Sequence, residues 1–450
     1  MLFDPQRIQS LLGYSSSSSV FNNNKKKKRI DPSSFVVLQL LLLCSSIIIL
    51  ATSSLPSSSF VSALKPANPT RMSVKSNSPS SSSVSSSLWP STNQPLLNGI
   101  ITPLVTPLLV DDDSNTNIID VESTRKIIEH VITGGVSGLF LLGTTGEGPT
   151  LSRSCKQQFI STCCSIVNGR IPILVLITCS SIHETIELAK YCQNLSEGGG
   201  VSAVVLTTPY YFPLDQPELV RYVDLVIDGM NNNHNNNNNK DNDNISKPLP
   251  IMLYNIPVLT KVQWDIDSIR QIITKYPTQI VGMKDSSGNL EYFQELCELR
   301  NELQRQDDFT ILMGPEHLTL ESMKLGSNGG VNGGSNVEPQ LFVQLYNEAI
   351  SAAAAASSKV TASRNEQQEE PPQQEQRVQK LQNRVLAFQD IYKVGNNGNQ
   401  KHAFPFVAAT KCAMKIKNLC SNDILSEPMI PFNEDERQQV ETILNNLPDI

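Results

Sequence analysis

Residues 280–288 read Ile-Val-Gly-Met-Lys-Asp-Ser-Ser-Gly, a short apolar run that ends in polar, turn-forming residues. Such a run predicts a buried β-strand. Side chains alternate along a strand, so Lys284 shares a face with Ile280 and Gly282 and lies at the carboxyl end. A lysine desolvated in such a place offers a neutral, nucleophilic amine, which is what a Schiff-base enzyme requires. The alternative is a lysine whose charged end extends into solvent.

Composition excludes several classes of function. The formal net charge of −7 gives no indication of nucleic-acid binding. The nine cysteines form no C-x-x-C motif and the five histidines have no metal-ligand spacing, so we expect no metal site. We interpret the cysteines as small buried apolar residues in a reducing compartment.

Residues 1–96 are expected to be a leader and not part of the fold. A basic block at 25–29, an apolar run at 35–51 and a small-residue cleavage site at 61–63 are typical of a signal peptide. The apolar run is also close to the length of a single membrane anchor. The serine-rich, acid-poor stretch 63–95 is typical of an organelle transit peptide, so we expect a bipartite leader directed to a plastid. The alternative is a secreted protein with a disordered serine linker.

Strand-like and helix-like segments alternate between residues 97 and 350. The expected strands are 99–108, 136–142, 172–177, 201–207, 250–253, 280–284, 309–313 and 329–334. The expected helices are 121–132, 152–167, 182–195, one opening at Pro217, 266–274, 290–303 and one ending near Leu325. Eight strand–helix units in about 250 residues predict a (β/α)₈ barrel.

Two inserts interrupt this pattern. Residues 231–244 are an asparagine tract, and residues 351–376 are rich in alanine, glutamine and glutamate. Both are expected to be low-complexity expansions at surface connections, because closing a longer loop costs little extra entropy. Residues 377–450 are expected to form helices appended to the barrel.

Polar side chains gather where the expected strands end, which in a barrel is the face that carries active sites. Tyr254 ends the strand before that of Lys284, so a phenol and an amine can meet at the barrel mouth. A phenol there could shuttle protons while a carbinolamine forms and breaks down. The alternative is a core aromatic residue with a satisfied hydroxyl.

The loop 143–148, Gly-Thr-Thr-Gly-Glu-Gly, follows a strand and precedes a helix. Its backbone N–H groups could bind an anion such as a carboxylate. It lacks the Gly-Lys-Ser/Thr of a phosphate-binding P-loop. The alternative is a tight turn that needs glycine for its geometry alone.

Four motifs occur in order: Gly-Thr-Thr-Gly-Glu, Pro-Tyr-Tyr, Tyr-Asn-Ile-Pro and Gly-Met-Lys-Asp-Ser. From residue 98 to roughly the end, apart from the inserts, the chain therefore resembles the dihydrodipicolinate synthase/N-acetylneuraminate lyase family of pyruvate-dependent class I aldolases. The resemblance implies a (β/α)₈ barrel, a homo-oligomer (dimer or tetramer), and a covalent imine with pyruvate in place of any metal or organic cofactor.

The resemblance also implies residue roles. Lys284 would form the imine with the ketone of pyruvate, and Tyr254 would be the general acid/base. Thr144 would link Tyr254 to Tyr211, which in the family reaches over from a neighbouring subunit. Substrate contacts would come from Gly143, Thr145, Gly314 and Val331.

One position departs from the dihydrodipicolinate synthase branch. Those enzymes carry an arginine two residues after the Tyr-Asn-x-Pro motif, where it binds a carboxylate of the second substrate. This chain has Leu259 there, which resembles the neuraminate-lyase branch. We therefore expect a small-molecule aldolase or lyase of the N-acetylneuraminate, 4-hydroxy-2-oxoglutarate or 2-keto-3-deoxy sugar acid type. The alternatives are 4-hydroxy-tetrahydrodipicolinate synthase, which uses pyruvate and aspartate semialdehyde, and a non-catalytic barrel that acts as a binding subunit.

Overall fold

The computed structural model describes residues 97–111, 116–232, 249–360, 373–395, 402 and 404–449. The expected leader and all but the first two residues of the asparagine tract lie outside the described residues. Within the described residues, no helix combines the length and apolar character needed to cross a bilayer.

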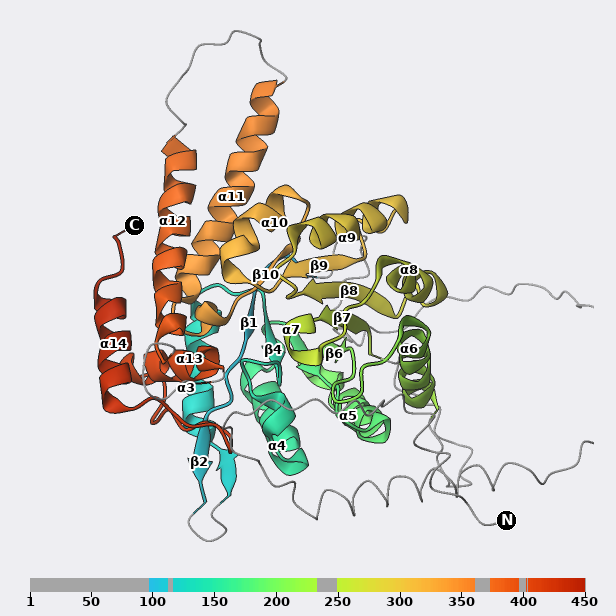
Figure 1. Cartoon of the computed structure of the whole chain (residues 1–450), viewed down its shortest axis with the longest axis horizontal. Coiled ribbons are helices and arrows are strands. Elements are labelled where there is room, and N and C mark those ends of the chain that lie inside the picture. Colours follow the sequence, from blue (N-terminus) through green and yellow to red (C-terminus); the bar gives the residue numbers. More distant parts are fainter. Residues whose placement is uncertain are drawn as a thin grey trace, which may run out of the picture. The chain divides into compact units, whose positions relative to one another are not determined.

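Eight parallel strands close into a barrel and follow one another around it in sequence order, which confirms the predicted architecture (Figure 1). They are β1 (Gly99–Pro103), β4 (Gly138–Leu141), β5 (Ile173–Leu176), β6 (Ala203–Thr207), β7 (Ile251–Asn255), β8 (Ile280–Asp285), β9 (Thr310–Met313) and β10 (Gly329–Val331). The expected strand 99–108 is in fact two elements. After β1 the chain leaves the barrel and forms an antiparallel hairpin of β2 (Leu108–Val110) and β3 (Asn117–Ile119).

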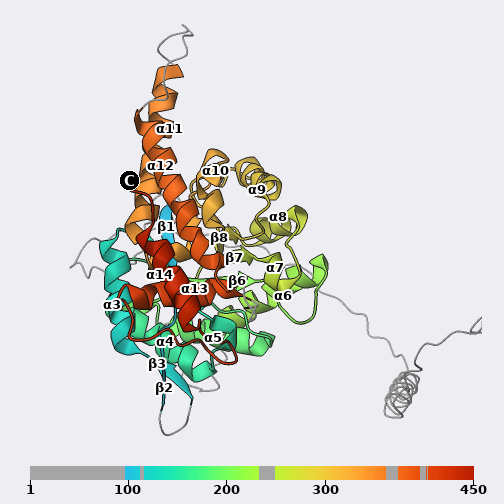
Figure 2. The ribbon, with the colours of Figure 1, turned by 60° about the vertical axis from the view of Figure 1, so that its left-hand side comes forward.

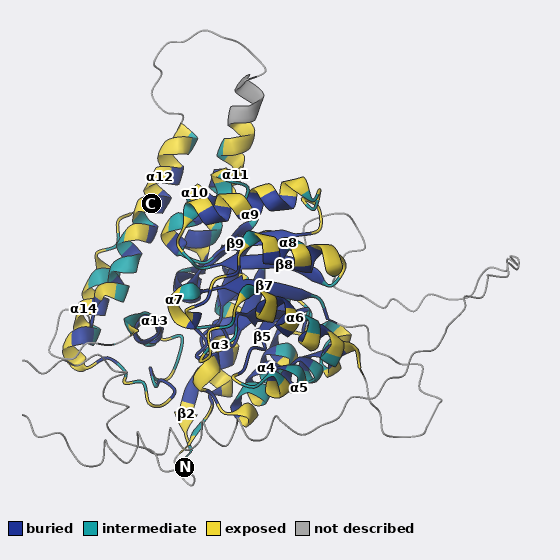
Figure 3. Ribbon diagram, turned by 45° about the vertical axis from the view of Figure 1, so that its right-hand side comes forward, coloured by how far each residue is buried: buried dark blue, intermediate teal, exposed yellow. Residues whose placement is uncertain are grey.

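Helices surround the barrel and present apolar faces to it. They are α3 (Val121–Thr133), α4 (Arg153–Val167), α5 (Ile182–Asn194), α6 (Gln216–Asn231), α8 (Ile266–Lys275), α9 (Leu290–Glu302) and α10 (Thr319–Lys324). The predicted helix start at Ser152 is confirmed, because its side chain accepts a hydrogen bond from the backbone N–H of Cys155. Figure 3 shows buried strands inside and helices whose outer faces are exposed. A parallel strand covered on both sides must be apolar along its whole length, as β8 is up to Lys284.

Strand register brings the two expected catalytic residues together. Tyr254 on β7 is the direct partner of Lys284 on β8, after a register shift near Ile251. Gly282 makes room for this pairing, because a Cβ there would lie 2.5 Å from the carbonyl oxygen of Thr310 and 3.0 Å from Cε of Met252. Only glycine therefore fits two residues before Lys284.

The C-terminal part of the chain is helical, as expected, but its boundaries differ from the prediction. It comprises α11 (Pro339–Val360), α12 (Gln373–Phe388), α13 (Pro405–Ile416) and α14 (Glu434–Asn445). Residues 351–360 continue α11 instead of opening a loop, and α12 begins at Gln373, so the insert expected at 351–376 was too wide. The physical reason is the alanine run 352–356, since alanine has the highest intrinsic helix propensity.

The pair α11–α12 stands beside the barrel as two neighbouring helices in both views (Figures 1 and 2). At its base the rings of Phe342 and Phe388 pack edge to face with centroids 6.3 Å apart. Phe388 also contacts Tyr392 in η5 (Gln389–Lys393), with centroids 6.0 Å apart. This aromatic contact anchors the C-terminal helices against the barrel and places η5 near the strand ends.

Candidate active site

A pocket of about 250 Å³ opens at the carboxyl ends of the strands. Its lining includes Lys284 from β8, Tyr254 from β7 and Gly314, which follows β9. Thr144 and Thr145 from the loop after β4 complete this set. The structure thus brings together residues from four strand–loop junctions, as expected for the catalytic face of a (β/α)₈ barrel.

Lys284 points into the barrel mouth and is only 5% exposed, which excludes the alternative of a lysine extended into solvent. Its Nζ lies 4.0 Å from the ring centroid of Tyr254 and 4.8 Å from that of Phe140. Lys284 takes part in none of the ion pairs found among the described residues. The Lys284 amine therefore lies against two aromatic rings and has no carboxylate partner among the described residues.

Tyr254 is held by polar contacts at the ends of β7 and β8. Its backbone carbonyl accepts a hydrogen bond of 3.3 Å from the indole N–H of Trp264. The next residue, Asn255, donates a 2.8 Å hydrogen bond from Nδ2 to Oδ1 of Asp285, the residue after Lys284. Burial raises the pKa of the Asp285 carboxyl. These contacts fix both strand ends, so the phenol and the amine keep their relative position.

The loop from Gly143 to Gly148 is a compact turn. The backbone N–H of Gly148 donates to the carbonyl of Gly143 at 3.3 Å, and that of Glu147 donates to the carbonyl of Thr144 at 3.1 Å. A Cβ at Gly148 would lie 1.8 Å from the carbonyl oxygen of Leu142, so this position requires glycine. The turn is tight, as the alternative interpretation expects, and Thr144 and Thr145 line the pocket. Binding of an anion by the N–H groups of the loop stays a prediction.

The other expected site residues divide into two groups. Val331, at the end of β10, lines the pocket together with Gly314. Gly143 and Leu259 do not line it, and Leu259 is 42% exposed while its neighbour Val258 faces the pocket. Tyr211 is also outside the pocket, 85% exposed, with a left-handed φ of 94°.

The sequence prediction missed Glu316 and Tyr392, which line the same pocket. Glu316 is buried, and Oε1 accepts hydrogen bonds from the Gly334 backbone N–H at 2.7 Å and the Tyr392 hydroxyl at 3.0 Å. Burial raises the pKa of Glu316 to about 7. Glu316 follows β9 closely, so the strand-end rule could have identified it. Tyr392 lies in the appended segment and has no local signal.

The C-terminal segment closes one side of the pocket. The residues it contributes are Gln389, Tyr392, Phe404 and Phe406. Burial lowers the pKa of the neighbouring His317, which favours its neutral form. Among the described lining residues Lys284 is the only lysine or arginine, and three of the four residues from the C-terminal segment are aromatic.

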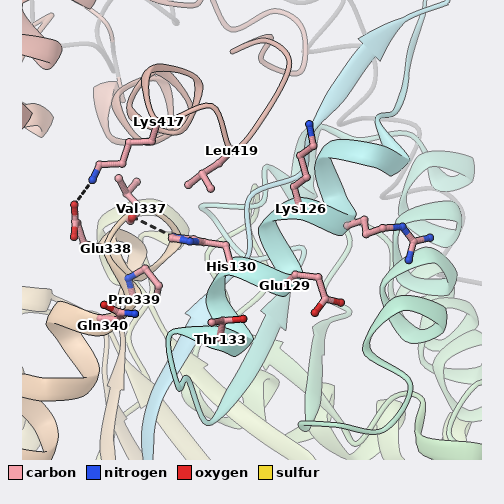
Figure 4. Close-up of a pocket in the computed structure, with 11 residues that line it drawn as sticks. Lys126, Glu129, His130, Thr133, Val337, Glu338, Pro339, Gln340, Lys417 and Leu419 are labelled. Carbon is pink, nitrogen blue, oxygen red and sulfur yellow. Dashed lines mark hydrogen bonds and ion pairs between the residues drawn. The ribbon is translucent and has the colours of Figure 1, made fainter.

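A larger cavity, of about 710 Å³, lies outside the barrel between α3 and the segments around Glu338 and Lys417 (Figure 4). Some of its polar groups are paired with one another. Lys417 forms an ion pair with Glu338, and Nε2 of His130 lies 3.2 Å from the carbonyl oxygen of Val337. None of the residues expected in the active site lines it. The candidate active site is therefore the smaller pocket at the strand ends, where Lys284 and Tyr254 meet.

Comparison with known proteins gives the family. Residues 96–238 and 242–370 match the model of the dihydrodipicolinate synthetase family, more than half of the chain. The chain belongs to this family. Its members use a lysine Schiff base with pyruvate and no external cofactor. The chain is therefore a carbon–carbon lyase of the class I pyruvate aldolase type.

Individual relatives agree with this assignment. A 4-hydroxy-tetrahydrodipicolinate synthase from Sorangium cellulosum is 32% identical over 244 residues, 54% of this chain and 71% of the relative. The corresponding enzyme of Methanothermobacter thermautotrophicus is 28% identical over 257 residues, 57% of this chain and 80% of the relative. The structure of dihydrodipicolinate synthase from Bacteroides thetaiotaomicron is 36% identical with a TM-score of 0.62, covering 78% of this chain and 99% of that one.

A more distant structure shares the fold alone. CdNal from Clostridium difficile, solved in complex with mannosamine, is 18% identical with a TM-score of 0.58. The match covers 78% of this chain and 99% of that one. This match shows that the fold is shared, while the substrate has to be argued from the pocket.

Proposed function

We propose that Lys284 forms an imine with pyruvate and that the resulting enamine attacks, or is released from, an aldehyde. The observation that carries this proposal is the position of the Lys284 amine, buried between the Tyr254 and Phe140 rings at the mouth of the barrel. No carboxylate among the described residues forms an ion pair with this amine, so it is not held by a counter-ion and can reach a carbonyl carbon in the pocket.

The chemistry then follows from these groups. The Lys284 nitrogen adds to the ketone carbon of pyruvate, and the carbinolamine loses water to give a protonated imine. Loss of a proton from the methyl carbon moves an electron pair into the imine, and the enamine so formed bonds to the aldehyde carbon. Tyr254 delivers and removes the protons, because its phenol is an acid/base group of the lining and its ring centroid lies 4.0 Å from Nζ of Lys284. Hydrolysis of the product imine restores the free amine.

Binding of the pyruvate carboxylate is assigned to the loop after β4. Backbone N–H groups around Thr144 and Thr145 can donate to a carboxylate in the pocket. Gly314 and Val331 would contribute backbone carbonyls on the opposite side. No step in this scheme requires a metal or an organic cofactor, because the protonated imine itself accepts the electron pair.

The aldehyde is proposed to carry no carboxylate of its own. The lining contains no arginine among its described residues, and Leu259 occupies the position where a carboxylate-binding arginine would stand. A neutral aldehyde fits the cleavage of N-acetylneuraminate or of a 2-keto-3-deoxy sugar acid. A 4-hydroxy-2-oxoglutarate aldolase, whose aldehyde is charged, would need a cation from outside this lining.

The second candidate is 4-hydroxy-tetrahydrodipicolinate synthase, acting on pyruvate and aspartate semialdehyde. It is favoured by the relatives in Sorangium cellulosum and Methanothermobacter thermautotrophicus, which carry this name. Both candidates share the Lys284 imine and differ only in the acceptor, so one experiment can test the shared step and a second can separate them.

The active unit is proposed to be a homo-oligomer. Tyr211 and Phe212 are both exposed, and their rings pack edge to face with centroids 5.0 Å apart. Two neighbouring exposed aromatic residues on a loop are typical of a surface that is covered by a partner. A second copy of this chain would cover them and bring Tyr211 toward the neighbouring pocket.

Borohydride reduction in the presence of pyruvate tests the shared step. We expect an adduct at Lys284 in the peptide map, absent in Lys284→Arg. Lys261, an exposed lysine seven residues after Tyr254, serves as the internal control and should stay unmodified. An adduct elsewhere, or none, would contradict the proposal. Turnover of aspartate semialdehyde compared with neutral aldehydes then separates the two candidates.

The leader is proposed to direct the protein to a plastid. A signal-like segment followed by a serine-rich, acid-poor stretch within residues 1–96 supports this. A fluorescent protein fused to these residues should accumulate in the plastid. Its appearance in the medium would instead support the secreted alternative.

A further inference from the structure

Glu147, in the loop that is assigned to the pyruvate carboxylate, has a buried contact with the C-terminal helices. Its side chain is fully buried and forms an ion pair with Lys411 of α13, whose side chain is 3% exposed. Oε2 of Glu147 accepts a 2.6 Å hydrogen bond from the backbone N–H of Ser426. Oε1 contacts the Lys411 ammonium and has no other hydrogen-bond partner in the described part of the chain.

Lys411 is fixed from its own side as well. Its Nζ donates a 2.7 Å hydrogen bond to the carbonyl of Ile424, in the segment that also carries Ser426. Burial lowers the pKa of Lys411, and the nearby Glu147 carboxylate opposes that effect. The ammonium therefore ties two segments of the C-terminal part of the chain to a single carboxylate in the loop after β4.

Glu147 is coupled to the pocket through the backbone of the loop. Its N–H donates to the carbonyl of Thr144 at 3.1 Å, and its φ of 55° is left-handed, which is strained for a residue other than glycine. Thr106 adds a 2.7 Å hydrogen bond from its hydroxyl to the carbonyl of Gly146. A displacement of Glu147 would thus be transmitted directly to the N–H groups around Thr144.

Stability alone does not explain a buried pair of this kind. Removing two charges from water costs free energy that their attraction barely recovers, and apolar replacements are often as stable. What a buried charge pair does provide is a defined geometry, because both groups must stay together. That geometry is needed here, since a carboxylate-binding turn works only if its N–H groups converge.

We propose that Lys411 is a positioning residue which, through Glu147, holds the loop after β4 in the conformation that binds the carboxylate of the 2-oxo acid. This inference rests on the proposed function, because it assigns the loop to that carboxylate. It gives the C-terminal helices a role in substrate binding in addition to their packing against the barrel.

The test measures how borohydride trapping on Lys284 depends on pyruvate concentration. Lys411→Met leaves the Glu147 carboxylate buried without its partner, so the loop should relax. We expect the half-saturating pyruvate concentration to rise about tenfold or more, since small displacements of binding groups are costly. The amount trapped at saturating pyruvate should stay at the wild-type level. A purely structural role would lower the amount trapped and leave the half-saturating concentration unchanged, which would overturn the proposal.

Lys415→Met is the matched control. Lys415 lies on the same helix, one turn further on, and pairs with Asp423 at 3.3 Å. Asp423 keeps a second partner, Arg437, at 2.9 Å, so the substitution leaves no orphaned charge. We expect the half-saturating pyruvate concentration of this variant to equal that of the wild type. An increase equal to that of Lys411→Met would show a general effect of charge on this helix and would overturn the proposal.

The double variant Glu147→Gln/Lys411→Met covers the case in which the single variant does not fold. It removes both charges, and a glutamine can still accept the bond from Ser426. The protein should fold, yet the half-saturating pyruvate concentration should remain raised, because the ion pair between Glu147 and Lys411 is lost. A return to the wild-type value would overturn the proposal. Absence of any trapping in the wild-type protein would overturn the proposed function, and this inference with it.

Discussion

Tyr254 contributes both a ring and a hydroxyl group to the pocket, and substitution can separate the two. Tyr254→Phe retains the ring, whose centroid lies 4.0 Å from Nζ of Lys284. Because only the proton shuttle is removed, we expect kcat to fall roughly 10²- to 10⁴-fold. Borohydride should still trap pyruvate on Lys284. Steady-state kinetics and peptide mapping measure the two effects separately.

Tyr292→Phe is the matched control for this experiment. Tyr292 is also buried, and its hydroxyl donates a 2.8 Å hydrogen bond to the carbonyl of Trp264, but it does not line the pocket. We expect the free energy of unfolding to fall by about 1 kcal/mol and kcat to remain near the wild-type value. A Tyr254→Phe protein with wild-type kcat would show that the phenol is not the acid/base group.

Glu316 makes the stability of the protein depend on pH. Burial raises its pKa from 4.5 to about 7, so between these values the folded protein holds a proton that the unfolded chain releases. The resulting contribution to the free energy of unfolding is fully present below pH 4.5 and is lost as the pH rises through about 7. At about 1.4 kcal/mol per pKa unit, the loss is about 3 kcal/mol.

The Glu316→Gln variant isolates this effect, because a glutamine does not titrate. Urea unfolding of both proteins at several pH values should show the wild type losing about 3 kcal/mol relative to the variant between pH 4.5 and 8. The other carboxyl groups cancel in the difference. If the unfolding free energies of the two proteins changed with pH in parallel, Glu316 would have an ordinary pKa in the folded protein.

At the scale of an element, the turn after β4 depends on a residue without a side chain. Gly148→Ala would place a Cβ 1.8 Å from the carbonyl oxygen of Leu142, so the turn must open. We expect a loss of about 3 kcal/mol in unfolding free energy, at the upper end of the usual cost of overpacking. The half-saturating pyruvate concentration for trapping should rise as well, because the turn carries Thr144 and Thr145.

Gly198→Ala is the control for backbone strain alone. Gly198 has a left-handed φ of +67°, and a Cβ there would meet no atom within 4 Å. We expect a cost of roughly 1 kcal/mol and no change in pyruvate trapping. If Gly148→Ala matched Gly198→Ala in both unfolding free energy and pyruvate trapping, the turn would accommodate a Cβ at position 148 without opening.

At the scale of the whole molecule, the proposed oligomer can be tested on its exposed aromatic surface. Phe212→Asp places a charge beside Tyr211, where a second copy would bury it, so we expect light scattering to give a lower mass than for the wild type. Activity should fall with the mass, because Tyr211 would no longer reach the neighbouring pocket. Ile430→Asp, at another exposed apolar position, should leave the mass unchanged. A wild-type protein that is monomeric and active would contradict the oligomer.

Local patterns in the sequence determined much of the fold. The start of α4 after Ser152 follows from a cap, and the end of β8 just after Lys284 follows from an apolar run; both depend only on neighbouring residues. The meeting of Tyr254 and Lys284 at the barrel mouth also follows, because parallel strands align their carboxyl ends, whereas their direct pairing depends on a register shift near Ile251. The alanine run at 352–356 fits a low-complexity connection by composition, yet α11 continues through it because alanine has the highest intrinsic helix propensity.

Only the tertiary structure decided which residues surround Lys284. Tyr392 reaches Glu316, and Lys411 reaches Glu147, across 76 and more than 200 positions of the chain. Likewise Val258 faces the pocket and Leu259 does not. Such contacts have no signature in the sequence, because they depend on how the C-terminal helices pack against the barrel and not on the periodicity of any single element. The sequence determined the amine and the strand that carries it, whereas the packing of remote segments decided the walls of its pocket.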